Sequence, residues 1–307
     1  NNRFRGQLHA AAGAFYFQAG GGADDVKTRM STELFLNVRY KMKDLGGFVL
    51  WQAGRTASLV LQYRQADYSY ENPDQEEIDI RSNLDRREDL VSFTAYLFRI
   101  AKASIFASVE SNRFHLKSKL SEFRDSRSIA VYAGAEFFPL PSSLGTAREK
   151  ILGRVSLGYM RYRVPDSLFK DYEGFVGEGG VDARLLRTTA FRLDFARDVQ
   201  FSAFSILGYF VQTSLGAGIV QTLAKNTNIS YNLIFGRNDY FELAGSPAGT
   251  APRQEFLTHQ LGFGLQLARS LRLGMAASLA RRTLNRDERA LKRTLLGLTL
   301  EYGSAGG

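Results

Sequence analysis

The sequence predicts an all-β fold, a transmembrane antiparallel up-and-down β-barrel, and three observations lead to this prediction. First, residues 257–267 alternate: the odd positions are nearly all large and apolar, and the even ones are Thr, Gln or Gly. This stretch matches the roughly 9–11 residues that a tilted strand needs to cross a bilayer. Second, the pattern restarts at 271–279 after a short link. Third, no run of about eighteen apolar residues could form a transmembrane helix.

The composition suits such a barrel. The 307 residues include 29 Gly, 23 Phe and 14 Tyr; glycines relieve crowding between strands, and aromatic residues form girdles at the membrane interfaces. The mean hydropathy of −0.21 is expected, because residues that face a polar lumen dilute the apolar signal of every strand. The absence of cysteine fits passage through an oxidising periplasm.

The net charge of +9 has a similar explanation. The arginines are spread over the whole chain and form no recognisable nucleic-acid-binding module. A basic lumen, or basic rims that face lipid phosphates, accounts for the charge better. We therefore expect no nucleic-acid partner.

The alternation occurs in fourteen segments, which predict about fourteen strands. They lie near 6–18, 29–40, 56–70, 88–99, 103–115, 126–138, 150–163, 176–187, 189–199, 208–222, 227–240, 256–268, 271–284 and 292–303. Short links fall at 54–55, 101–102, 186–188, 223–226 and 268–270, and long ones near 19–28, 71–87, 116–125, 164–175, 200–207, 241–255 and 285–291. Short periplasmic turns and longer external loops are typical of barrels in the bacterial outer membrane. We expect one such barrel over 1–303, followed by a Gly/Ser/Ala tail at 304–307.

Two segments do not fit this scheme. Residues 139–149 form a long link where a short one is due. Residues 41–55 include a stretch that is apolar on both faces, and three interpretations stay open: a bulged extension of the second strand, a short extra strand, or a plug in the lumen. Sixteen strands would follow if this segment and a stretch preceding Asn1 each add one.

A weak internal repeat supports the hairpin arrangement. Residues 62–68 and 235–240 are similar, and each stretch closes a strand that follows a tight turn. Each ends in a tyrosine, Tyr68 or Tyr240. We expect both tyrosines in the outer aromatic girdle.

These features resemble a known family. The tight hairpins, the strand ends with Arg-x-x-Asp-Tyr or Arg-Asn-Asp-Tyr, and the 197–199 stretch that opens a long loop resemble the outer-membrane β-barrel porins associated with exopolysaccharide gene clusters. The similarity is strongest over 189–303. It implies an outer-membrane barrel with a role in polysaccharide export, and it brings no catalytic residue.

If the apolar positions face lipid, the opposite face of each strand lines the lumen. The lumen-lining candidates are Arg39, Arg64, Glu136, Arg154, Asp182, Arg184, Arg192, Asp194, Gln260, Gln266, Arg272, Arg293 and Glu301, and the same face carries Glu110 and Glu178. Cations and anions nearly balance. Such a lining could create a transverse field that orients a polar or sugar-like solute, or it could consist of cross-strand ion pairs that only satisfy the interior.

The lipid-facing candidates come from the strands with the cleanest alternation. They are Ile229, Tyr231, Leu233, Phe235, Leu261, Phe263, Leu265, Leu296, Leu298 and Leu300. External basic residues cluster over 113–127 and 281–292. Guanidinium groups pair well with phosphates, so outer-membrane lipids and lipopolysaccharide are candidate partners, and solvated loop charge is the alternative.

Little in the sequence indicates catalytic activity. Only His9, His115 and His259 could act as imidazole bases, and none has an evident acid partner and nucleophile. We expect no enzyme activity, no cofactor and no metal site.

The leading prediction is a porin-like outer-membrane channel, for polysaccharide export or for small polar solutes. The alternative is a closed barrel that anchors a partner protein of an envelope complex. A soluble all-β protein is the third possibility, but it would have to bury far more apolar strand surface than one sandwich can use.

Overall fold

The computed structural model describes most of the chain. The described residues are 2–29, 37–54, 56–71, 83–100, 103–119, 121–137, 151–165, 169–184, 186, 188–202, 208–224, 226–241, 252–268, 270–284 and 287–302. Among them, no helix is long and apolar enough to cross a membrane.

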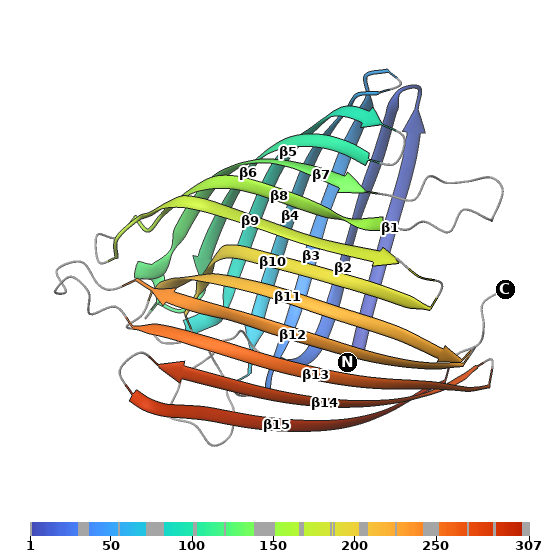
Figure 1. Ribbon diagram of the computed structural model, residues 1–307. Coiled ribbons are helices and arrows are strands. Elements are labelled where there is room, and N and C mark those ends of the chain that lie inside the picture. The colour runs from blue at the N-terminus through green and yellow to red at the C-terminus, as the bar shows by residue number, and fades with distance from the viewer. Residues whose placement is uncertain are drawn as a thin grey trace.

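The described residues form a single antiparallel sheet of 15 strands, in which each strand is hydrogen-bonded to the next one along the chain (Figure 1). The strands are β1 (Asn2–Ala12), β2 (Phe15–Arg29), β3 (Asn37–Gln52), β4 (Ser58–Tyr70), β5 (Arg86–Ile100), β6 (Ala103–Leu116), β7 (Ser126–Phe137), β8 (Ile151–Arg163), β9 (Tyr172–Arg184), β10 (Thr189–Phe201), β11 (Tyr209–Ala224), β12 (Thr227–Tyr240), β13 (Arg253–Ala268), β14 (Leu271–Leu284) and β15 (Asp287–Tyr302). One turn of 3-10 helix, η1 (Glu122–Arg124), lies between β6 and β7.

The sheet curls round on itself, so that the last strands pass in front of the first ones in Figure 1. The up-and-down order and the strand lengths confirm the predicted fold class. The two edges are β1 and β15, and the described residues show no hydrogen-bonded pairing between them. Because neighbouring strands are antiparallel and their number is odd, β1 and β15 run in the same direction.

The links divide the sheet into two ends. Links of only two residues, 13–14, 225–226 and 269–270, join β1 to β2, β11 to β12 and β13 to β14, and this is the short-turn end. The links from β4 to β5, β6 to β7, β8 to β9, β10 to β11 and β12 to β13 lie at the opposite, long-loop end. Since β15 begins at Asp287, the long link predicted at 285–291 is wrong. The predicted link at 139–149 lies outside the described residues.

The N-terminal quarter differs most from the prediction. Residues 6–18 form two strands joined by a turn, where Gly13 has a φ of 61°, and the predicted loop at 19–28 belongs to β2. Glycines at 20–22 lack side chains, so they show no alternation. A Cβ on Gly20 would lie 2.7 Å from the carbonyl oxygen of Gly6, so the neighbouring backbone leaves no room for one. Residues 41–52 supply most of β3, which takes the place of the strand predicted at 29–40. The described strands number 15 instead of fourteen because the predicted strand 6–18 divides between β1 and β2.

The register gives the sheet two distinct faces. The outward face carries large exposed apolar side chains, including Leu8 at 79%, Leu193 at 60% and Leu296 at 82% of full exposure. Over most of each strand, the lumenal face carries the other residues: odd positions of β1 and β15, and even positions of β2 to β14. The long-loop ends of β10 and β11 depart from this alternation, because Phe201, Tyr209 and Val211 pack inward there. An exposed apolar belt around a sheet is unfavourable in water and suits contact with lipid.

Candidate functional site: the lumenal lining

The lumenal face gathers charged side chains through strand register. Glu136 on β7 lies directly opposite Arg154 on β8, and Asp182 on β9 lies opposite Arg192 on β10. Residues opposite each other in an antiparallel pair are close enough for their side chains to interact. The lining is therefore built from rows of charges on adjacent strands.

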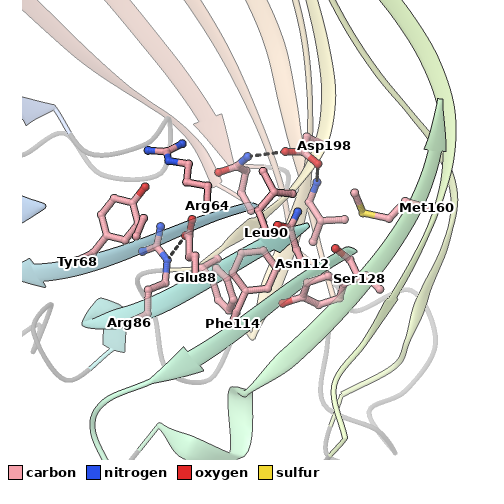
Figure 2. Close-up of a pocket in the computed structure, with 15 residues that line it drawn as sticks. Arg64, Tyr68, Arg86, Glu88, Leu90, Asn112, Phe114, Ser128, Met160 and Asp198 are labelled. Carbon is pink, nitrogen blue, oxygen red and sulfur yellow. Dashed lines mark hydrogen bonds and ion pairs between the residues drawn. The ribbon is translucent and has the colours of Figure 1, made fainter. Parts of the chain in front are cut away.

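A cavity of about 340 Å³ occupies the lumen near the long-loop end. Figure 2 shows Arg64, Glu88, Asn112 and Asp198 around it, on strands β4, β5, β6 and β10. In the wall of this cavity the Arg86 guanidinium donates to the Glu88 carboxylate at 2.6 Å. Hydrogen-bonding and charged groups therefore converge on this space from strands that are far apart in the sheet.

A second cavity of about 250 Å³ shares Asn112, Asp198 and Gln200 with the first. It is also lined by Glu110, Arg154 and Glu178. The two cavities together form a groove with charges of both signs. Its β4–β5 side carries Arg64, Arg86 and Glu88, and its other side carries Glu110, Glu178 and Asp198 together with Arg154 and Arg197. A charged or dipolar solute in this groove would experience a field across the lumen.

A third cavity of about 380 Å³ lies toward the short-turn end. Its lining is more apolar and includes Phe48 and Leu50 of β3 together with Tyr96. The Tyr96 hydroxyl donates to the Glu136 carboxylate at 3.1 Å. The polar part of the lumen is thus followed by a less polar part at the short-turn end.

An apolar cluster packs at the long-loop end. Its buried members are Ala130, Met160, Tyr162, Val164, Phe169, Tyr172, Val176, Tyr209 and Val211. Phe201 at the end of β10 joins this region, with its ring centre 5.1 Å from that of Phe114 on β6. These two strands are not neighbours in the sheet, so the contact crosses the interior.

Arg124 of η1 ties three links together at this end. Its side chain is only 1% exposed. It donates to the carbonyl oxygens of Asn83 at 3.3 Å, Ser202 at 2.6 Å and Gly208 at 2.8 Å. The links from β4 to β5, β6 to β7 and β10 to β11 therefore meet over the long-loop end of the sheet.

The structure places the predicted lumenal residues mostly on one face. The register puts the following on the lumenal face: Arg64, Glu136, Arg154, Asp182, Arg184, Arg192, Asp194, Gln260, Gln266, Arg272 and Arg293. The cavities bring Arg64 and Arg154 into one groove, whereas Gln260, Gln266, Arg272 and Arg293 lie on β13 to β15, away from it. The backbone of Glu301 pairs with Arg272, but its side chain lies outside the described part of the chain.

Arg39 is placed differently from the prediction. It shares the outward face of β3 with Leu45, and its Nε donates to the Asp25 carboxylate at 2.9 Å. The prediction of a lumenal Arg39 is wrong because residues 29–40 do not form one strand: β2 ends at Arg29, and Arg39 lies near the start of β3. Tyr68 and Tyr240 also differ: both lie on the lumenal face and not in an outer girdle. Tyr240 is buried against Phe210.

The predicted lipid-facing residues all lie on the outward face. They are Ile229, Tyr231, Leu233, Phe235, Leu261, Phe263, Leu265, Leu296, Leu298 and Leu300. Phe235 is 55% exposed and Leu261 is 54% exposed. His259 lies on this face too, and its Nδ1 is 2.8 Å from the Tyr231 hydroxyl oxygen.

Sequence reasoning missed Arg86 and Phe201. It also placed Arg124 among the external basic residues of 113–127, whereas the structure buries this side chain at 1% exposure. The start of β5 cannot be recognised from the sequence, because residues 85–89 are all charged and the strand shows no alternation there. Arg124 and Phe201 lie in or beside links, where no alternation marks a residue as buried. Within the described residues, no group of three or more His, Asp or Glu side chains is arranged to hold a metal ion.

The curled meander of long strands, its apolar outward face and its polar lumenal face define a β-barrel of the bacterial outer membrane. The chain belongs to the family described as "Putative beta-barrel porin 2", whose model matches residues 55–302. This match confirms the porin resemblance, the fold class and the outer-membrane location.

Solved structures with a similar arrangement are outer-membrane proteins of greater length, and this chain spans between about half and two thirds of them. The "Copper transporter OprC" shares 13% identity over 98% of this chain and 57% of its own, with a TM-score of 0.49. The siderophore receptor PirA from Pseudomonas aeruginosa shares 13% identity over 97% of this chain and 67% of its own, with a TM-score of 0.40. The outer membrane transporter YddB from Escherichia coli shares 9% identity over 92% of this chain and 55% of its own, with a TM-score of 0.40. Comparison with curated protein sequences finds no match.

Proposed function

We propose that this outer-membrane barrel is a channel that passes small polar solutes through its lumen. The observation that carries the proposal is the groove of two joined cavities, lined by charged and amide side chains from β4 to β11. About eight strands fill a barrel with their own side chains, whereas sixteen to eighteen leave an aqueous channel. The 15 described strands are close to the second case.

The charge distribution supports passage of a charged or dipolar solute. Arg86 and Arg192 have carboxylate partners, Glu88 at 2.6 Å and Asp194 at 2.7 Å. Among the described residues, neither Arg64 nor Glu110 forms an ion pair with another side chain. Groups that are not neutralised by a direct partner can act on a solute in the lumen.

The packing of aromatic side chains inside the barrel favours small solutes over a polysaccharide chain. The aromatic contact between Phe114 and Phe201 narrows the interior near the long-loop end. Export of a polymer, which the exopolysaccharide resemblance implies, would require this contact to open. We therefore place polysaccharide export second.

A closed barrel that anchors an envelope protein is the alternative, and one observation favours it. The buried Arg124 side chain holds three links together over the long-loop end. If these links close the mouth in the membrane, no solute passes. Neither candidate function includes a catalytic step, a cofactor or a metal ion.

Single-channel recording in a planar bilayer distinguishes the two functions. The detergent-purified protein is expected to give steady openings, and Phe201→Ala is expected to enlarge them. A folded wild-type barrel that stays silent, together with a silent Phe201→Ala variant, would contradict the channel and support the anchor. Folding of both proteins is checked by the heat-dependent shift in gel migration that folded barrels show.

A further inference from the structure

We propose that the outward face of β6 to β8, at its long-loop end, binds the phosphate groups of an outer-leaflet glycolipid through Arg113, Arg127 and Arg163. This surface lies on the opposite face of the sheet from the lumenal groove. The proposal therefore does not depend on whether the barrel conducts.

The first observation is a row of like charges in register. Arg113 on β6 is directly opposite Arg127 on β7, and Arg127 is directly opposite Arg163 on β8. Arg161 lies two residues from Arg163 on the same face of β8. Like charges directly opposite each other destabilise a sheet. An anion that bridges them would remove the repulsion.

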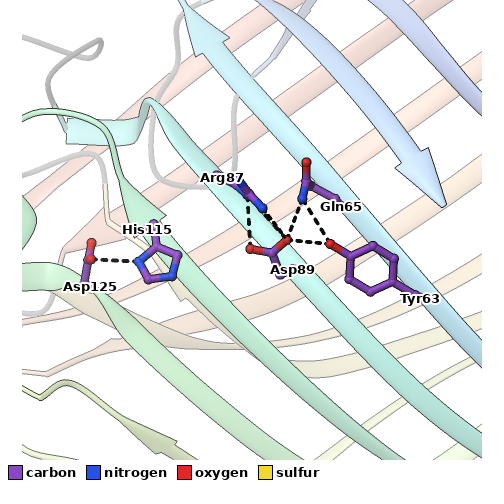
Figure 3. A network of polar contacts seen from close by, with 6 residues as sticks. All are labelled: Tyr63, Gln65, Arg87, Asp89, His115 and Asp125. Carbon is purple, nitrogen blue, oxygen red and sulfur yellow. Dashed lines mark hydrogen bonds and ion pairs between the residues drawn. The ribbon is translucent and has the colours of Figure 1, made fainter.

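The nearby carboxylates already have other partners. Asp89, which is opposite Arg113 on β5, accepts from the Tyr63 hydroxyl at 3.0 Å, the Gln65 amide at 2.9 Å and Arg87 at 3.2 Å (Figure 3). Asp125 lies 3.0 Å from His115 Nδ1 and accepts from the Leu116 backbone N–H at 2.7 Å (Figure 3).

The β8 arginines have partners from the start of β9 and the link before it. Arg161 lies 3.5 Å from the Glu173 carboxylate, and Arg163 lies 3.7 Å from that of Asp171. Arg113 and Arg127 form no ion pair among the described residues. These two are the centre of the proposed site.

The position of the row matches the headgroup level of a membrane. Ile129, two residues from Arg127 on the same face, is 56% exposed, and Val131 is 53% exposed. Val109 on β6 continues this apolar surface at 46% exposure. The arginines thus lie where the apolar belt ends. Acyl chains can pack against the belt while the guanidinium groups bind the phosphates above it.

The occupant that fits is a phosphorylated glycolipid with several acyl chains. A free phosphate would satisfy the charges but would leave the adjoining apolar surface uncovered. Guanidinium pairs bind phosphate oxygens in a planar, bidentate geometry, and neighbouring arginines can share one phosphate group.

The test measures thermal unfolding of the purified barrel in detergent with added diphosphorylated lipid A, dephosphorylated lipid A or inorganic phosphate. The wild type is expected to gain stability with diphosphorylated lipid A alone. The double variant Arg113→Gln with Arg127→Gln is expected to bind this lipid about tenfold more weakly or worse, because it loses two charge-assisted contacts. Without lipid, it should unfold at the same temperature or higher, since the repulsion is relieved.

The matched control is Arg237→Gln with Arg253→Gln, which removes the same charge from the outward face. Arg237 and Arg253 lie 3.0 and 2.8 Å from the Asp239 carboxylate, so this variant should respond to the lipid like the wild type. The proposal fails if the first variant keeps its full response, if dephosphorylated lipid A works equally well, or if inorganic phosphate gives the same gain. A lower unfolding temperature without lipid, with an unchanged response, would show a purely structural role.

Discussion

The guanidinium carbon of Arg86 on β5 lies 5.4 Å from the centre of the Phe201 ring on β10. The same guanidinium lies 4.6 Å from the ring centre of Tyr68 on β4. Because β5 and β10 are separated by four strands in the sheet, this contact crosses the interior of the barrel between strands that are not neighbours. Together with the contact between Phe201 and Phe114, it narrows the lumen near the long-loop end.

Phe201→Ala is expected to widen this narrow region and raise the single-channel conductance. The substitution removes the ring that contacts both Arg86 and Phe114. Phe235→Ala is the control, because Phe235 lies on the outward face at 55% exposure and its removal leaves the lumen unchanged. Equal conductance of the two variants would show that Phe201 does not limit passage.

Arg124→Ala is expected to release the three links that meet at the long-loop end. Each carbonyl that loses its buried donor costs about 1–3 kcal/mol if nothing replaces the donor. Unfolding in denaturant should reveal the loss of stability, and limited proteolysis should show faster cleavage of these links. Lys119→Ala, in the same link but exposed, is expected to change the unfolding free energy by less than about 0.5 kcal/mol. Equal protease resistance of both variants would contradict the role of Arg124.

Leu261→Arg and Gln260→Arg test which face of β13 meets lipid. The two residues are adjacent near the middle of the strand, and Leu261 lies on the outward face at 54% exposure. An arginine facing the bilayer midplane costs about 2–4 kcal/mol, whereas one in a hydrated lumen costs little. Unfolding in lipid vesicles gives both values. Similar losses for the two variants would mean that the assignment of faces is wrong.

Arg64→Gln and Glu110→Gln are expected to shift the ion selectivity of the channel in opposite directions. Arg64 lines the first lumenal cavity and Glu110 the second. Loss of the cation should favour passage of cations, and loss of the carboxylate should favour passage of anions. Reversal potentials in a salt gradient measure both shifts, which should shrink as the ionic strength rises. Shifts of the same sign would contradict a field across the groove.

The second half of the fold could be predicted closely from the sequence. In β12 to β15, large apolar residues alternate with small or polar ones at most positions, with exceptions such as Ile234 and Phe256, so the pattern assigns most side chains to a face. Leu233 and Leu298 illustrate this: both lie on the outward face that the alternation predicts. The same reasoning failed in β2 and β3. Glycines carry no side chain to alternate, and Phe48 and Leu50 put apolar side chains on the lumenal face as well.

The sequence by itself determined the fold class, the outer-membrane location and the faces of most strands, because a strand crossing a bilayer must alternate along its own length. Only the tertiary structure decided which residues meet inside the barrel. Arg86 and Phe201 are far apart in the chain, and Arg124 binds carbonyl groups of two other links. Such contacts depend on how the sheet curls and how the links pack over its end. The period of a single strand carries no information about either.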